Sequence, residues 1–233
     1  MDVKENSIDL FVPGRLCLLG EHSDWAGLYL SLIHIYEPLK PKDIAAIHAG
    51  LYRRWDDTLF QHYLEKFRLP QKQVKEYSRG MKMKLAISAA LSHHPKLLIL
   101  DEATSGLDPV VRNEILDEFL EFIQDEEHSI LFSSHITSDL EHVADYITLI
   151  HEGQIVFSRS KDELVDNYGI LRCGAADFET LGHEDMLTYQ KSAFGYAVLV
   201  DDKRKVRRAY PKLVVDDASV EDIMLFYVKG ESI

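Results

Sequence analysis

Two neighbouring carboxylates and one histidine are the residues of this chain whose positions best suit chemistry. Asp101 and Glu102 directly follow the apolar run "KLLIL" (96–100), and His135 follows a second run, "SILFSS" (129–134). The carboxyl ends of parallel strands meet at one edge of a sheet, where open α/β sheets bind ligands. There Asp101 could hold Mg²⁺ through water, Glu102 could deprotonate an attacking water, and His135 could reach a terminal phosphate.

Each of these features also has an ordinary structural explanation. An Asp-Glu pair after a strand can be a helix cap with a solvated neighbour, and a lone histidine is more often structural. The segment "YSRGM" (77–81) adds a further candidate, because it opens a predicted helix with a hydroxyl and with exposed backbone N–H groups. The positive end of a helix dipole makes such a segment an anion site.

The elements that must position these residues can be predicted from the apolar pattern. The runs at 96–100 and 129–134 are typical of strands buried on both faces of a parallel sheet. The helix between them has Asp108 where an N-cap belongs and Pro109 at its first position. Strand, helix and strand then form a crossover unit. The residues of this helix that we expect to face inward are Ile115, Phe119 and Ile123.

Three amphipathic helices are predicted between about residues 44 and 93, the second of them capped by Asp56 or Asp57. A hairpin is expected around Glu152-Gly153, and a final helix near Ser219. The expected inward stripes of the three helices are Ile44, Ile47 and Leu51, then Leu59, Tyr63 and Phe67, then Met83, Ile87 and Leu91.

Composition restricts the class of protein. With 233 residues and 46% apolar residues, the chain can bury a core of one domain or one and a half. A net charge of −13 works against binding along a nucleic-acid backbone, so the basic run at 201–210 is interpreted as a solvated strand or turn. Two cysteines are too few for a disulfide framework, and no charged-then-apolar leader opens the sequence, so we expect a cytoplasmic protein. No apolar window is long enough to span a membrane. Any membrane association is expected through a partner.

The order "YSRGMKMKL … LLILDEATSGLD … LFSSHITSDL" resembles the nucleotide-binding subunit of an ABC transporter, from about Asp43 to at least Asn167. The resemblance implies ATP and Mg²⁺ as ligands. It also implies two partners, a membrane-spanning transporter subunit and a second ATP-binding subunit, at the cytoplasmic face of an exporter's membrane. The implied site residues are Ser78, Arg79, Gly80 and Met81 in the signature motif, Asp101 (Walker B, Mg²⁺ through water), Glu102 (catalytic base), Asp108 (D-loop) and His135 (switch histidine).

The fold implied by this resemblance is α/β, with a partial P-loop NTPase-like parallel sheet of the ABC type, a helical subdomain and a small α+β C-terminal extension. The expected divisions are an N-terminal fragment (1–27), a junction (28–42), a helical subdomain with the signature motif (43–94), a core (95–169) and the extension (170–233).

One part of the family's site is missing from the sequence. No Gly-Lys pair occurs anywhere, so the Walker A lysine that neutralises bound phosphates has no counterpart. The spacing from Gly14 to Gly20 is one residue too long for that loop, and no Q-loop glutamine is recognisable. We therefore expect a truncated subunit with little or no ATPase activity of its own.

The N-terminal stretch "PGRLCLLGEHSDWAG" instead resembles the first motif of sugar kinases related to galactokinase, in which Glu21, His22 and Asp24 would hold sugar hydroxyls. The phosphate loop of that family is not found. The segment "LSLIHIYEPLKP" resembles a translated sequencing adapter, so a chimeric reading frame is preferred to an evolved fusion. Residues 1–42 are then expected to add strands that do not complete the ABC sheet in its usual order. A sugar kinase and a non-enzymatic fragment remain the alternative functions.

Overall fold

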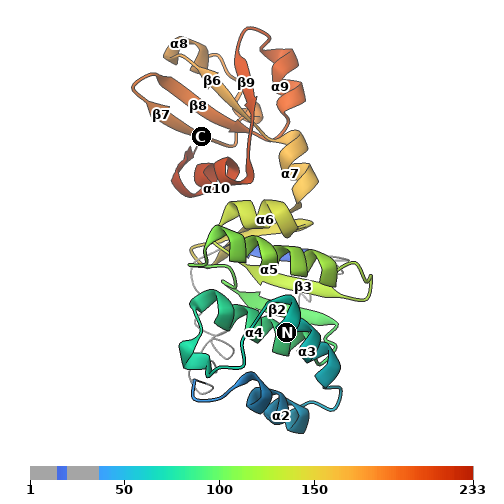
Figure 1. Cartoon of the computed structure of the whole chain (residues 1–233). Helices are drawn as coiled ribbons and strands as arrows, with labels where there is room; N and C mark the ends of the chain where they lie inside the picture. The colour runs from blue at the N-terminus through green and yellow to red at the C-terminus, as the bar shows by residue number, and fades with distance from the viewer. Residues whose placement is uncertain (1–14, 20–36, 233) are drawn as a thin grey trace, which may run out of the picture.

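The computed structural model describes residues 15–19 and 37–232 (Figure 1). The first half of the described chain contains β1 (Arg15–Leu19), α2 (Pro41–Leu51), α3 (Asp57–Lys66), η1 (Val74–Glu76), α4 (Arg79–Leu91), β2 (Leu97–Asp101), α5 (Pro109–Phe122) and β3 (Ser129–Ser133). The second half contains α6 (Thr137–Val143), β4 (Tyr146–His151), β5 (Gln154–Ser160), α7 (Lys161–Asn167), β6 (Gly169–Cys173), α8 (Ala175–Phe178), η2 (His183–Asp185), β7 (Thr188–Ser192), β8 (Gly195–Val200), α9 (Lys203–Ala209), β9 (Val214–Asp217), α10 (Val220–Lys229) and β10 (Glu231–Ser232).

The first sheet has the strand order β2-β3-β1-β4-β5. Its first four strands run parallel, and β5 returns antiparallel to β4. The predicted parallel strands between 95 and 150 are thus confirmed. The hairpin is confirmed too, since Glu152 and Gly153 have φ values of 50° and 75°, as a two-residue turn of the hairpin type requires.

Strand β1 lies inside this sheet and not at an edge. Arg15–Leu18 pair with Ile130–Ser133 of β3, and Leu16–Leu19 pair with Tyr146–Leu149 of β4, both in parallel. We expected residues 1–42 to add strands that do not complete the ABC sheet in its usual order. Within the described residues, β1 is the strand that this segment adds, and it lies between β3 and β4. Its interior position means that β3 and β4 depend on it for their hydrogen bonds.

Helix α5 packs against one face of the sheet. Asp108 caps it by accepting a hydrogen bond from the Val111 N–H at 3.1 Å, and Pro109 is its first residue, as predicted. Ile115 and Phe119 are fully buried, and the Phe119 ring meets the Phe132 ring of β3 edge to face at 5.9 Å. The predicted caps and inward residues therefore place this helix on the core, with Ile123 partly buried.

Strand β2 differs from the prediction of a strand buried on both faces. Leu98 is buried, but Leu97 and Ile99 are 54% and 61% exposed. The reason is that β2 is an edge strand of the described sheet and its side chains alternate between the faces. The face carrying Leu98 packs on the core, and the face carrying Leu97 and Ile99 does not.

The helical part, α2 to α4, forms its own core. Asp56 caps α3, as predicted, by accepting from the Leu59 N–H at 2.9 Å. The α4 stripe of Met83, Ile87 and Leu91 is buried as predicted, but in the core of the first sheet; α4 contributes Leu85 and Ala89 to the core of the helical part. The α3 stripe is offset, because Phe60, Leu64 and Phe67 are its buried residues while Leu59 and Tyr63 are half-buried.

The predicted inward stripe of α2 is wrong at two of its three positions. Ile44 is buried, but Ile47 is 39% and Leu51 is 69% exposed. The inward face of α2 consists of Pro41, Ile44, Ala45 and His48. A histidine therefore takes the place that the apolar pattern gave to Leu51.

Ion pairs fasten α5 to the helical part. Lys66 of α3 lies 2.7 Å from Glu118 and 2.6 Å from Glu121, and Lys84 of α4 pairs with Glu114. Glu114, Glu118 and Glu121 stand at i, i+4 and i+7, so they share one face of α5. The Glu118 side chain is almost entirely buried. Because a buried charge needs a partner, this pairing fixes where α3 sits on α5.

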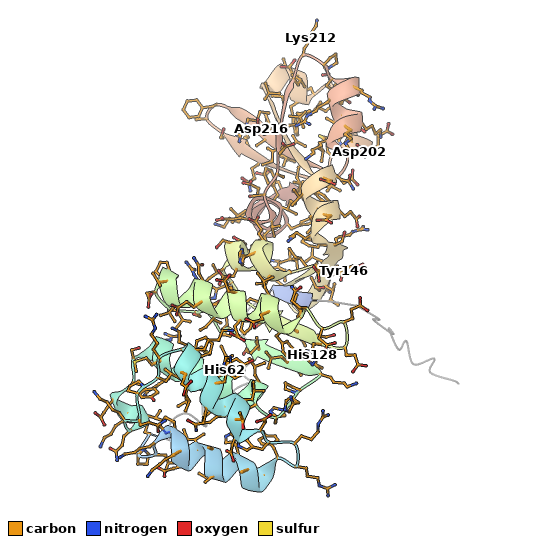
Figure 2. The ribbon with its side chains drawn as sticks, turned by 45° about the vertical axis from the view of Figure 1, so that its right-hand side comes forward. His62, His128, Tyr146, Asp202, Lys212 and Asp216 are labelled. Atoms are coloured by element: carbon orange, nitrogen blue, oxygen red, sulfur yellow. The ribbon has the colours of Figure 1, made fainter. Side chains whose placement is uncertain are left out.

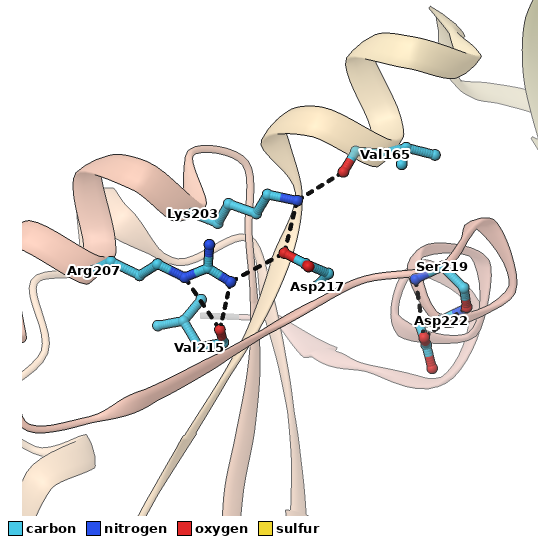
Figure 3. Close-up of polar contacts among 7 residues, drawn as sticks. All are labelled: Val165, Lys203, Arg207, Val215, Asp217, Ser219 and Asp222. Atoms are coloured by element: carbon cyan, nitrogen blue, oxygen red, sulfur yellow. Dashed lines mark hydrogen bonds and ion pairs between the residues drawn. The ribbon is translucent and has the colours of Figure 1, made fainter.

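The C-terminal unit is a second sheet, antiparallel throughout, with the order β10-β7-β8-β6-β9. The basic run is helix α9 and not the predicted strand or turn. Figure 3 shows that Lys203 donates to the Val165 carbonyl at 2.8 Å and lies 2.9 Å from Asp217. Arg207 donates to the Val215 carbonyl at 2.7 Å and to Asp217 at 3.0 Å. These cations hold α7, α9 and β9 together.

The last helix joins the two sheets. Ser219 caps α10 with a capping box to Asp222, as expected of a helix starting there. The Val220 N–H donates to Glu141 of α6 at 2.9 Å, and Val220 and Ile223 are buried in the same core as Phe132. Within residues 15–19 and 37–232, no helix has the length and apolar character to cross a membrane.

Aromatic and imidazole rings stack on one another in the helical part, between α2 and the end of α4. His48 is buried and stacks with Tyr52 at 5.5 Å, and Tyr52 stacks with His93 at 4.5 Å. Burial, and then the nearby His93, lower the pKa of His48. Burial also lowers the pKa of His93, although its hydrogen bond to the backbone of Ala89 opposes the change.

These shifts predict that the protein loses stability in mild acid. As the pH falls, the histidines of the unfolded chain, with an ordinary pKa of 6.5, take up protons at a higher pH than those of the folded chain. The contribution of the two histidines to the free energy of unfolding is therefore fully present above pH 6.5 and declines below it. The loss is at most about 1.4 kcal/mol per pH unit for each histidine. Urea unfolding at about pH 7.5 and about pH 5.5 measures it.

The variant His48→Gln/His93→Gln should flatten this dependence. His62→Gln is the control, because His62 is exposed on α3 (Figure 2). The explanation fails if the double variant loses as much stability in acid as the unaltered chain does.

Candidate active site

The carboxyl ends of β2 and β3 bring three predicted site residues together. Asp101, the last residue of β2, stands opposite Ser133, the last residue of β3. His135 follows β3, and its Nδ1 lies 2.5 Å from Oε2 of Glu102. The Glu102 side chain is 22% exposed and the His135 side chain 62% exposed. A half-buried carboxylate therefore meets a solvent-facing imidazole.

The backbone at Glu102 has an unusual conformation. Its φ is +49°, in the left-handed region that residues other than glycine, asparagine and aspartate rarely adopt. The Glu102 N–H donates to both the carbonyl and the hydroxyl oxygen of Ser133, each at 3.1 Å. Such conformations cluster at functional sites, where surrounding contacts hold them. Here the left-handed turn ends β2 next to His135.

Ser133 is a functional candidate that the sequence analysis missed. Its hydroxyl donates to Oδ1 of Asp101 while accepting from the Glu102 N–H. One serine among four in the run "SILFSS" and its flanks carries no pattern of its own. The signal that could have found it is the parallel register, which sets the last residue of β3 beside the last residue of β2.

The signature segment packs within the same chain against the loop after β2. Ser78 is the N-cap of α4 and accepts from the Met81 N–H at 3.2 Å. Gly80 is buried, and an added Cβ would come within 2.8 Å of a Val111 methyl group on α5. The Arg79 guanidinium lies over Gly106, whose φ of +65° also favours glycine. The start of α4 is thereby held beside the start of α5.

The predicted residues therefore form two groups. One contains Asp101, Glu102 and His135 at the sheet edge. The other is the signature segment 78–81, which packs on the loop and helix that Asp108 caps. Nothing in the described part of the chain gathers three or more His, Cys, Asp or Glu side chains in a metal-binding cluster. The sugar-site candidates Glu21, His22 and Asp24 lie outside the described residues.

A cavity of about 580 Å³ lies elsewhere, at the β7–β8 hairpin of the C-terminal unit. Arg172, Lys191, Lys212 and Phe194 are among its lining residues. Lys212 stands at the far tip of this unit in Figure 2. The cavity shares no residue with either group of site residues, so it adds nothing to the chemistry of Glu102.

Comparison with known proteins points to one family. Residues 19–105 match the family model described as ABC transporter. The chain is 46% identical over 94 residues to the lantibiotic transport ATP-binding protein SrtF of Streptococcus pyogenes, covering 40% of this chain and 41% of that protein. It is 36% identical over 145 residues to an ABC transporter ATP-binding protein of Mycoplasma pneumoniae, covering 60% of this chain and 44% of that protein.

Solved structures agree on the fold. An ATP-binding subunit of an ABC transporter has a TM-score of 0.51 at 21% identity, covering 66% of this chain and 81% of that one. A metal-chelate type ABC transporter in an inward-facing conformation has a TM-score of 0.52 at 14% identity, covering 83% of this chain and 88% of that one. Together with the parallel and antiparallel sheets and their helices, these likenesses show an α/β fold like that of ABC ATP-binding subunits, which is consistent with the P-loop NTPase-like type.

The family match has two consequences for the sequence interpretation. It begins at residue 19 and runs through the proposed junction, and the relatives described above are ABC transporter ATP-binding proteins, so these findings support the transporter interpretation and not the galactokinase-like alternative. The chain spans about two fifths of the length of the curated relatives it matches. The matches support an ABC transporter ATP-binding domain in this chain, and the relatives that match it are ABC ATP-binding proteins.

Proposed function

We propose that this chain derives from the ATP-hydrolysing subunit of an ABC transporter of the exporter type, and that it is inactive alone because its sequence has no Walker A lysine. The observation that carries the proposal is the contact between Glu102 and His135 at the carboxyl ends of two adjacent parallel strands. A carboxylate held beside an imidazole at this edge suits water activation next to a terminal phosphate.

In this proposal Glu102 is the general base and His135 contacts the terminal phosphate. Asp101 would hold Mg²⁺ through a water molecule, since this ion prefers hard oxygen ligands and keeps several waters. The metal, when bound with ATP, supplies charge neutralisation at the phosphates. The Ser133 hydroxyl donates to Asp101, which suits an ionised carboxylate in that role.

The signature segment would act on nucleotide held by a second ATP-binding subunit. Ser78 is exposed at the start of a thirteen-residue helix, where backbone N–H groups favour an anion. Its hydroxyl accepts from Met81 and keeps its own hydrogen to donate. Arg79, Gly80 and Met81 complete this surface, and Asp108 belongs to the loop that would line the same interface.

The further partner is a membrane-spanning subunit, which would place this chain on the cytoplasmic face of a membrane. The helical subdomain, 43–94, is the proposed contact, and the exposed Ile47 and Leu51 of α2 give it apolar surface. The core, 95–169, and the extension, 170–233, complete the proposed divisions. The relative SrtF is named for lantibiotic transport, whereas the cargo here would be set by the membrane subunit.

We predict that the purified chain hydrolyses little or no ATP. Without a Gly-Lys pair, no lysine of a phosphate loop positions and neutralises the γ-phosphate for Glu102. Steady-state phosphate release should equal that of Glu102→Gln. Release that Glu102→Gln abolishes would refute the inactivity. Release that requires a sugar would instead revive the alternative site of Glu21 and Asp24.

The signature segment should nevertheless work in trans. Mixing this chain with an intact homologous subunit whose own signature serine is disabled should restore ATP turnover. Ser78→Ala should lower that turnover roughly 10- to 150-fold, since a hydrogen bond to a charged group contributes about 1.5–3 kcal/mol.

Ser138→Ala is the control for this experiment, because Ser138 is exposed on α6. No rescue by a chain whose circular dichroism shows it folded would leave a non-enzymatic fragment as the better description.

A further inference from the structure

We propose that Ser133 is a positioning residue, which holds the Asp101 carboxylate and the Glu102 backbone in their reactive arrangement. This inference rests on the proposed function, because that function gives Asp101 and Glu102 a reaction to be positioned for. The hydrogen bonds from which it is argued are present without nucleotide. Neither the sequence motifs nor the resemblance assigns a role to this residue.

The hydrogen-bonding capacity of Ser133 matches this role. A serine hydroxyl has one hydrogen to donate and two lone pairs to accept with. Its hydrogen goes to Oδ1 of Asp101, and a lone pair accepts from the Glu102 N–H at 3.1 Å. The carbonyl of the same serine also accepts from that N–H, at 3.1 Å. One residue on β3 therefore contacts both carboxylate-bearing residues that end β2.

The conformation of Glu102 explains why such a contact is needed. A left-handed φ of +49° is unfavourable for glutamate, so neighbouring contacts must hold it. The next backbone bond, from the Ser105 N–H to the Glu102 carbonyl at 3.0 Å, closes the turn on the other side. With both ends of Glu102 held, its side chain meets His135 at 2.5 Å. If the Glu102 N–H lost its hydrogen bond to Ser133, the Glu102 side chain would be held less firmly at this distance from His135.

Ser134 offers a matched control in the adjacent position. It is a serine directly after β3, and it is nearly fully buried. Its hydroxyl oxygen accepts from the Ile136 N–H at 3.0 Å. Ser134→Ala therefore removes a hydrogen bond from the turn after β3 and leaves the hydrogen bonds of Asp101 and Glu102 to Ser133 in place.

The test is amide hydrogen exchange at Glu102, with the ring signals of His135, measured by NMR on the full chain without nucleotide. Ser133→Ala removes the hydroxyl bond to the Glu102 N–H and keeps the carbonyl bond, so it should speed exchange at Glu102 about two- to tenfold and shift the His135 signals. Ser133→Thr, which keeps the hydroxyl, should restore both. Ser134→Ala should leave Glu102 unchanged.

The proposal is overturned if Ser133→Ala leaves both signals as they are, or if Ser133→Thr behaves like Ser133→Ala. Should Ser133→Ala fail to fold, Ser133→Cys carries the same expectation, because a thiol keeps the size but donates weakly. Since no ATP is present, the result stands apart from the turnover experiments. An absence of trans rescue together with faster exchange rejects the proposed function and supports the positioning.

Discussion

The parallel pairing of β2 with β3 is the constraint on which the site depends. Asp101 faces Ser133 because the two strands pair from Leu97 and Ser129 onward without a shift. The core enforces this register, since Phe132 and Leu98 are buried on one face and a slip of one residue would turn them to the other. A hydrophobic requirement on one face thus decides which polar groups meet at the strand ends.

Helix α5 connects the sheet to the helical part and to the signature segment. Its apolar side packs Ile115 and Phe119 on the sheet, and another side carries the glutamates that pair with Lys66 and Lys84 of the helical part. Its first turn contacts the signature segment through Val111 and Gly80. The position of the signature segment relative to the sheet edge is therefore set by this helix, together with the contact of Arg79 with the loop at Gly106.

The features of this fold that depend on neighbouring residues could be predicted from the sequence, whereas those that depend on residues distant in the sequence could not. The caps at Asp56, Asp108 and Ser219 lie within three residues of the groups they bind, so the sequence displays them. The inward face of α2, the helix at 203–209 and the interior place of β1 depend on distant partners. In the site, Asp101, Glu102 and His135 follow apolar runs that mark strand ends. Ser133 gains its contacts only from the pairing of two strands 32 residues apart.

The way α9 covers β9 bears on how these molecules behave in a crowded solution. A strand at the border of a sheet offers unpaired carbonyl and N–H groups to any passing strand. Arg207 occupies the Val215 carbonyl, and Asp217 at the end of the same strand is held by two cations. At the opposite border, β10 is two residues long. At the β9 border of the antiparallel sheet, part of the hydrogen-bonding capacity is therefore already used by side chains of α9, which leaves fewer groups for a neighbouring strand to pair with.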